Sequence, residues 1–331
     1  MTIYTWFYPD MAQLADPGYG ADLVARLQRL QATGLFCLPD EGAALADPAP
    51  LREFMARCQG AGLDCQIGFL PFSEPPDPTP EMLRRRYTYS QDGALKYREL
   101  CPAWPENRML AVHRATQLLE ALEPGALHLD FMRYFFANNP VFGVDLEWED
   151  GRKWLDTYFR CDCPLCQTER LELLGREATA YDHQHPGFVF KRIQQRAEHV
   201  EEVLRALRRL TQQHDTRLTA AVRVQYFNRA LIEGQDWVRW CEEGLVDAVS
   251  PMNYATSVAV VEQRFVENQR LLRNARVAVW EGIARRSSAG ESTPEALLAQ
   301  AQRLVELGAA GVSLFHLGVL TEEDYRLWEA P

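Results

Sequence analysis

The carboxylate best placed for chemistry is Asp130, which lies in the apolar stretch GALHLDFMRYFF at residues 125–136. This stretch is typical of a buried strand, and its polar residues, including Arg133 and Tyr134, gather toward its C-terminal end. Burying an unpaired carboxylate costs free energy, so an acid at the end of a core strand has either a partner or a function. We therefore predict that Asp130 is catalytic, and the alternative is a structural carboxylate held by Arg133.

A second chemical signal is a cluster of three cysteines in the sequence CDCPLC, namely Cys161, Cys163 and Cys166. Three thiolates at this spacing can reach one ion, and a structural Zn²⁺ site takes four ligands. We expect Cys101 to be the fourth ligand, with His183 or His185 as substitutes. Three reduced thiols packed inside an insertion are the alternative. No cofactor is expected for catalysis itself.

These residues need a scaffold, and apolar runs alternate with helical patterns along the whole chain. The expected strands are residues 3–8, 35–38, 65–70, 126–131, 218–224, 246–252, 277–280 and 312–315. The longest expected helix covers residues 188–214. No GxGxxG or GxxxxGK[ST] motif follows any expected strand. The pattern predicts an α/β fold in which residues 1–331 form a single (β/α)8 TIM barrel.

Two long insertions interrupt this alternation. The first runs from Pro71 to Tyr97 after the third strand and is rich in proline and charge. The second covers residues 137–187 after the fourth strand and carries the CxCxxC cluster. About 50 residues with little periodicity are too few to bury a core of their own. We therefore expect residues 137–187 to form a metal-bound lid rather than a separate domain.

In a (β/α)8 barrel the active site is built at the C-terminal ends of the strands. Reading the expected strand ends gives a set of candidate substrate-binding residues. They are Trp6, Tyr8, Asp40, Arg133, Tyr134, Tyr226, Asn253, Tyr254, Trp280 and His316. Aromatic faces next to carboxylates and amides are suited to sugars, although core packing is the alternative for each aromatic residue.

Three segments carry a resemblance to a known family. CPAWPENR, HLDFMRY and GQDWVRWCEEGLVDAVSPMNY resemble the corresponding segments of the loosely characterised glycoside-hydrolase-like TIM barrels, over residues 100–255. The resemblance implies an enzyme that cleaves a polysaccharide or glycoside, with Asp130 in the active site. It does not specify the sugar or the linkage.

Glycoside hydrolysis usually needs two carboxyl groups flanking one bond. Asp130 and Glu281, expected at the ends of the fourth and seventh strands, are the predicted pair. Arg133 would lower the pKa of Asp130, and an aromatic neighbour would raise that of Glu281. We therefore predict that Asp130 is the nucleophile or base and Glu281 the acid, with Asp40 or Glu41 as substitutes if Glu281 is turned outward.

Composition limits the other functions. A net charge of −11 disfavours binding to a nucleic acid backbone. The chain has no apolar run of about 18 residues, and the segment MTIYTWFYPD does not look like a secretory signal, so a cytoplasmic location without membrane contact is expected. The expected partner is a carbohydrate, and the oligomeric state is left open. A non-catalytic carbohydrate-binding barrel and a metal-dependent hydrolase or isomerase are the alternatives.

Overall fold

The computed structural model describes residues 1–86, 99–134, 161–179, 181–182 and 185–329. Parallel strands close into one barrel in the order β1-β10-β7-β6-β5-β4-β3-β2. These strands are β1 (Thr2–Phe7), β2 (Gly34–Cys37), β3 (Asp64–Phe69), β4 (Ala126–Leu129), β5 (Arg217–Val222), β6 (Ala248–Pro251), β7 (Ala278–Ala284) and β10 (Gly311–Phe315). The predicted single (β/α)8 barrel is confirmed.

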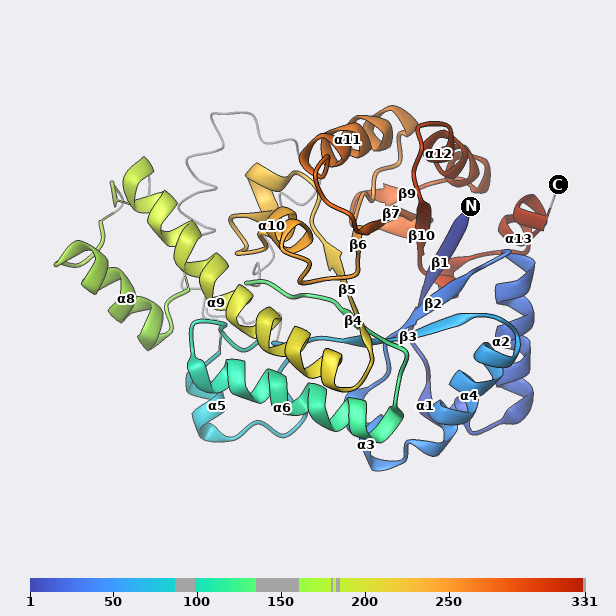
Figure 1. Ribbon diagram of the computed structural model, residues 1–331, viewed down its shortest axis with the longest axis horizontal. Coiled ribbons are helices and arrows are strands. Elements are labelled where there is room, and N and C mark those ends of the chain that lie inside the picture. The colour runs from blue at the N-terminus through green and yellow to red at the C-terminus, as the bar shows by residue number, and fades with distance from the viewer. Residues whose placement is uncertain (87–98, 135–160, 180, 183–184, 330–331) are drawn as a thin grey trace.

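Helices surround the barrel, as Figure 1 shows. The longer ones are α2 (Pro17–Arg29), α4 (Ala49–Gly60), α6 (Pro105–Leu122), α8 (Pro164–Leu174), α9 (Pro186–Gln213), α11 (Val258–Leu271) and α12 (Pro294–Glu306). The short ones are α1 (Met11–Leu14), α3 (Glu41–Ala46), α5 (Pro80–Arg84), α10 (Trp237–Glu242), α13 (Glu322–Glu329), the π-helix η2 (Tyr226–Ala230) and the 3-10 helix η3 (Leu317–Val319). Two short strands, β8 (Arg286–Ser287) and β9 (Gly290–Glu291), form a separate hairpin.

The apolar core has two layers because side chains alternate across each strand. One layer lies between the strands and the helices. The other fills the barrel itself and contains Tyr4, Trp6, Phe36 and Trp280. The rings of Tyr4 and Trp280 are 4.2 Å apart, and the ring of Phe36 stacks on that of His128 at 3.8 Å. The barrel interior is therefore packed, and a site can form only at its end.

Two strand ends decide where the predicted catalytic residues lie. β4 ends at Leu129, so Asp130 is the first residue after it, and the amide of Asp130 donates to the carbonyl of Phe69 at the end of β3. β7 was expected to end at Trp280 but continues to Ala284, because its pairing with β10 extends that far. Glu281 is therefore in the middle of a strand rather than at its end.

The second insertion is described only in part. Its residues 161–174 carry the cysteine cluster and α8, which lies beside the N-terminal half of α9 (Figure 1). Residues 137–160 and His183 lie outside the described residues, as do residues 87–98 of the first insertion. The expected lid thus stays a prediction. Within the described ranges, no helix is long and apolar enough to cross a bilayer.

Candidate active site at the carboxyl end of the barrel

Asp130 is held at the end of β4 by the backbone that follows it. Its side chain is buried, and its Oδ1 accepts a hydrogen bond from the amide of Phe131 at 2.7 Å. Phe131 has a φ of 51°, in the left-handed region that aromatic residues rarely adopt. Burial raises the pKa of Asp130, against the opposing effects of Arg133, this hydrogen bond and Arg223. Arg133 acts in the expected direction, but burial outweighs it.

Arg133 pairs with a residue that the sequence did not point to. Its Nε lies 2.7 Å from Oε2 of Glu233, and Arg223 contacts the same carboxylate at 3.1 Å. The guanidinium also lies over the ring of Phe131, with 4.2 Å from its central carbon to the ring centroid. Burial, reinforced by Arg223, lowers the pKa of Arg133 to about 10. Among the described residues, the buried Nη1 of Arg133 has no hydrogen-bond partner, so it can donate to a ligand.

A second carboxyl group near Asp130 is Glu99, which sequence reasoning missed. Glu99 forms an antiparallel bridge with Ser73, and the next amide donates to the carbonyl of Phe72, so Glu99 lies just beyond β3. Burial raises the pKa of Glu99 to about 8; Arg133 opposes this effect and the charge of Asp130 adds to it. The two carboxyls therefore interact. The sequence offered one clue, since Glu99 lies two residues before the start of the CPAWPENR segment at Cys101.

Two predicted tyrosines interact with Asp130, and the predicted His316 lies beside one of them. Tyr8 follows β1 and keeps 47% of its surface exposed, and Tyr254 follows β6. Burial raises the pKa of both tyrosines, and the charge of Asp130 adds to the effect. The ring of Tyr254 stacks on Phe315 at 5.0 Å, and that of Tyr8 meets His316 at 5.6 Å. Tyr8, Tyr254 and His316 thus surround the end of the barrel on the side of β1, β6 and β10.

Other predicted residues lie elsewhere. Trp6 and Trp280 are buried in the apolar interior of the barrel and do not line its mouth. Asp40 is exposed and caps α3, where its Oδ1 accepts from the amide of Ala43 at 2.8 Å. Its neighbour Glu41 forms an ion pair with Arg114, with 2.7 Å between Oε1 and Nε. Both carboxylates proposed as substitutes for Glu281 therefore have structural partners.

The hydroxyl groups of Tyr134 and Tyr226 are also engaged. Tyr134 is buried, and its hydroxyl lies 2.6 Å from Nδ1 of His199 on α9. Tyr226 is buried in η2, and its hydroxyl donates to Asp236. These side chains support the loops behind the site, because their polar ends point to protein partners.

The structure corrects the position of Glu281. Its side chain is fully buried, and its Oε1 accepts hydrogen bonds from the amide nitrogens of Asn253 at 2.9 Å and Asn268 at 3.0 Å. Asn268 belongs to α11, so Glu281 faces the helix layer, while its neighbour Trp280 faces the barrel interior. Burial raises the pKa of Glu281 to about 8. Glu281 and Asn253 are thus a buried polar pair outside the barrel mouth.

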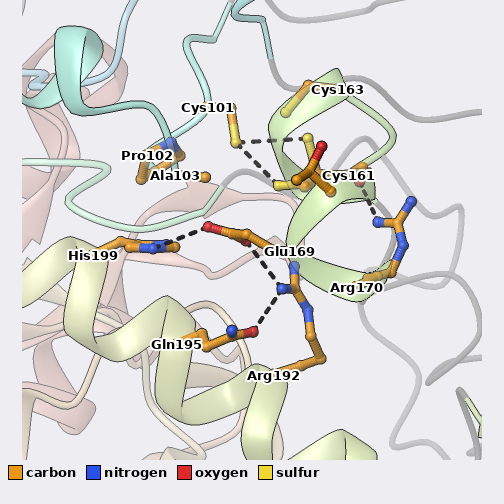
Figure 2. A network of polar contacts seen from close by, with 12 residues as sticks. Cys101, Pro102, Ala103, Cys161, Cys163, Glu169, Arg170, Arg192, Gln195 and His199 are labelled. Atoms are coloured by element: carbon orange, nitrogen blue, oxygen red, sulfur yellow. Dashed lines mark hydrogen bonds and ion pairs between the residues drawn. The ribbon is translucent and has the colours of Figure 1, made fainter. Parts of the chain in front are cut away.

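The four predicted metal-binding cysteines do come together. The sulfur atoms of Cys101, Cys161, Cys163 and Cys166 all lie within 4.8 Å of one another. Figure 2 labels Cys101, Cys161 and Cys163 beside α8, with Glu169, Arg192 and His199 next to them. His185, a substitute ligand in the sequence prediction, caps α9 and is not part of this group.

The surface along α11 also has two open hollows, lined among others by Phe265, Val266 and Arg270. They lie on the helix layer, and none of the residues around Asp130 lines them. We therefore place the candidate site at the carboxyl end of the barrel, where buried charged groups converge.

No protein-family model and no curated protein sequence matches this chain. Solved structures do match it. The glycoside hydrolase domain of PgaB (BpsB) from Bordetella bronchiseptica has a TM-score of 0.67 and 13% identity, covering 99% of this chain and 95% of that domain. A chitinase from Chromobacterium violaceum has a TM-score of 0.52 and 10% identity, covering 99% and 98%. Alpha-L-fucosidase isoenzyme 2 from Paenibacillus thiaminolyticus has a TM-score of 0.58 and 9% identity, covering 99% of this chain and 48% of that one. The chain therefore shares its barrel fold with these glycoside hydrolases.

Proposed function

We propose that this chain is a glycoside hydrolase that cleaves an oligo- or polysaccharide with Asp130 and Glu99. The observation that carries the proposal is the interaction of the buried Asp130 with the partly buried Glu99, beyond the ends of the neighbouring strands β3 and β4. Glycoside hydrolysis requires such a pair, with one group protonated and the other ionised. The fold shared with glycoside hydrolase domains supports the same reaction class.

The surroundings of the two carboxyls assign their roles. Glu99, with a pKa of about 8, keeps its proton at neutral pH and is the general acid that protonates the leaving oxygen. Burial raises the pKa of Asp130, but an amide hydrogen bond and the positive charges of Arg133 and Arg223 oppose this effect and favour its ionised form. Asp130 is then the nucleophile, or the base that activates water. Glu99 takes the role first predicted for Glu281.

Substrate contacts follow from the groups around this pair. The half-exposed ring of Tyr8 and the stacked rings of Tyr254 and Phe315 offer flat surfaces for the C–H faces of a sugar. The Nη1 group of Arg133 can donate to a sugar hydroxyl next to Asp130. These contacts suit an uncharged saccharide.

The test is hydrolysis of defined oligosaccharides by the wild-type protein and by Asp130→Asn. The panel includes chitin oligosaccharides, because a chitinase shares the fold, together with β-glucans and xylans. We expect the wild type to release new reducing ends and Asp130→Asn to lose about 10³-fold in kcat/KM with its fold intact. Full activity in this variant would exclude the mechanism. Binding of a saccharide without cleavage would favour the carbohydrate-binding barrel.

A further inference from the structure

Four buried sulfur atoms meet where the segment before α6 approaches the start of α8 (Figure 2). Cys101 Sγ lies 3.6 Å from the sulfurs of both Cys161 and Cys166. A disulfide bond requires about 2.05 Å. Four sulfurs arranged tetrahedrally around a zinc ion, with Zn–S bonds of about 2.3 Å, lie about 3.8 Å apart. The spacing therefore matches four ligands of one ion rather than two disulfides.

Groups beside Cys163 and Cys166 can stabilise negative charge on the cluster. The indole nitrogen of Trp104 donates to Cys163 Sγ at 3.3 Å. Cys163 is the N-cap residue of α8, and Cys166 lies in the first turn, where the helix dipole stabilises negative charge. The guanidinium of the buried Arg192 interacts with the charge of Cys166. A side-chain donor, a helix terminus and a cation thus act on the same cluster.

One ligand of the cluster belongs to the segment that carries a candidate catalytic residue. Cys101 lies two residues after Glu99, and the short backbone between them leaves little freedom. The carbonyl of Cys101 accepts from the side-chain nitrogen of Asn107 at 2.9 Å, and its amide donates to the carbonyl of Arg85 at 2.8 Å. A bond that holds the sulfur of Cys101 in place therefore also holds the backbone at Glu99 in place.

The other ligands lie on the α8 segment, which is linked through His199 of α9 to Tyr134. Glu169 on α8 is 3.2 Å from Nε2 of His199, and Nδ1 of His199 is 2.6 Å from the hydroxyl of Tyr134. Tyr134 comes four residues after Asp130. Figure 2 shows the Glu169–His199 contact next to the cysteines. The cluster is thus connected to the segments of both candidate catalytic carboxyls.

We propose that Cys101, Cys161, Cys163 and Cys166 bind one Zn²⁺ ion, which fixes the Glu99 segment and α8 against the barrel. The ion is structural, because four protein sulfurs complete a tetrahedral site and leave no position for water or substrate. The cysteine geometry carries this inference, so it does not depend on the glycosidase assignment. A tetrahedral sulfur site also suits iron, and the experiment must therefore identify the metal.

The first experiment measures metal in protein purified without chelator or added metal, by inductively coupled plasma mass spectrometry. We expect about one zinc per chain in the wild type. The double variant Cys161→Ser/Cys163→Ser should hold less than about a tenth of that amount. Cys241→Ser, which changes a buried cysteine outside the cluster, should keep its zinc.

Stoichiometric iron, metal-free wild-type protein, or full zinc in the double variant would each overturn the proposal. If the double variant does not fold, cobalt substitution of the wild type decides the point. Four thiolates around Co²⁺ should give intense sulfur-to-cobalt charge-transfer absorption. Its absence in cobalt-loaded protein would exclude the four-cysteine site.

The second experiment tests what the ion holds in place, by hydrogen exchange on wild-type protein before and after zinc removal with a chelator. We expect amides of residues 99–104 and 161–174 to exchange at least about tenfold faster without zinc, while those of β1 and β10 keep their rates. Equal acceleration throughout the chain, or none in residues 99–104, would contradict the positioning role. Neither result depends on catalytic activity.

Discussion

Asp130 and Glu281 lie in different parts of the barrel, and their positions distinguish a candidate catalytic carboxyl from a structural one. Both are buried carboxyl groups, and burial raises the pKa of each. Glu281 lies between β7 and α11, where two neutral amides donate to it. Asp130 lies at the open end of the barrel, near a second carboxyl and two guanidinium groups.

The comparison shows that a raised pKa does not by itself identify a catalytic acid. Any carboxyl that is removed from water is easier to protonate, whether or not a substrate can reach it. Here the position of each carboxyl in the barrel distinguishes a catalytic group from a structural one. Side chains between the strands and helices serve packing, while residues that follow the strands can meet a substrate.

The sharpest test of this difference pairs two matched variants, Glu99→Gln and Glu281→Gln. Each removes one carboxyl with a pKa raised to about 8 and keeps its shape. We expect Glu99→Gln to lower kcat/KM by about 10³-fold, since the general acid is lost. Glu281→Gln should stay within about twofold of the wild type, because its side chain does not reach the barrel mouth. Steady-state kinetics on folded protein checks both values, and the opposite ranking would restore Glu281 as the acid.

A second test uses the pH dependence of stability. The carboxyl of Glu281 ionises above its ordinary pKa of 4.5 in the unfolded chain but stays protonated to about pH 8 in the folded one. The unfolded state therefore binds fewer protons, and the stability that this group contributes falls as pH rises. Between about pH 5 and about pH 7 the loss is on the order of 2–3 kcal/mol.

Glu281→Gln lacks this titration, so its free energy of unfolding should rise by about that amount relative to the wild type over the same pH interval. Urea unfolding at both pH values measures the change. A constant difference between the two proteins would mean that Glu281 is ionised when folded.

Replacing Arg133 by lysine tests the geometry around Asp130. In the wild type, the Nε of Arg133 contacts Glu233 while its Nη1 can still donate to a ligand. Lysine keeps the positive charge but has no forked group that can do both. We expect Arg133→Lys to reduce kcat by about 20-fold, through loss of one oriented charge-assisted hydrogen bond. Thermal unfolding should show that the fold survives. Unchanged kinetics would assign Arg133 to the ion pair with Glu233 alone.

The smallest expected effect is the fall of kcat/KM on the basic side of the pH–rate profile. Glu99 must be protonated to act as the acid, so kcat/KM should be nearly constant up to neutral pH and fall above about pH 8. At about pH 9 the loss should be about tenfold. The residual activity of Glu99→Gln should lack this fall. A wild-type profile that is flat across this range would rule out Glu99 as the acid.

The sequence by itself determined the fold and part of the site. Alternating apolar runs and helical patterns are local signals, and their repetition was enough to predict the barrel. The apolar stretch around Asp130 placed that residue correctly at the end of the fourth strand. The spacing of CDCPLC and the choice of Cys101 predicted four sulfurs that the structure brings together. Apart from the choice of Cys101, residues close in the chain or a rule of the fold carried the information.

Only the tertiary structure decided which carboxyl accompanies Asp130. Pairing with β10 lengthened β7 beyond Trp280, and alternation along the strand then turned Glu281 toward α11. Glu99 lies just after an aperiodic insertion, and its bridge to Ser73, beyond the end of β3, joins the two ends of that insertion. The partner of Arg133 is likewise Glu233, which is distant along the chain. Long-range packing sets such contacts, because local periodicity fixes which residues form a strand but not which side chains meet beyond its end.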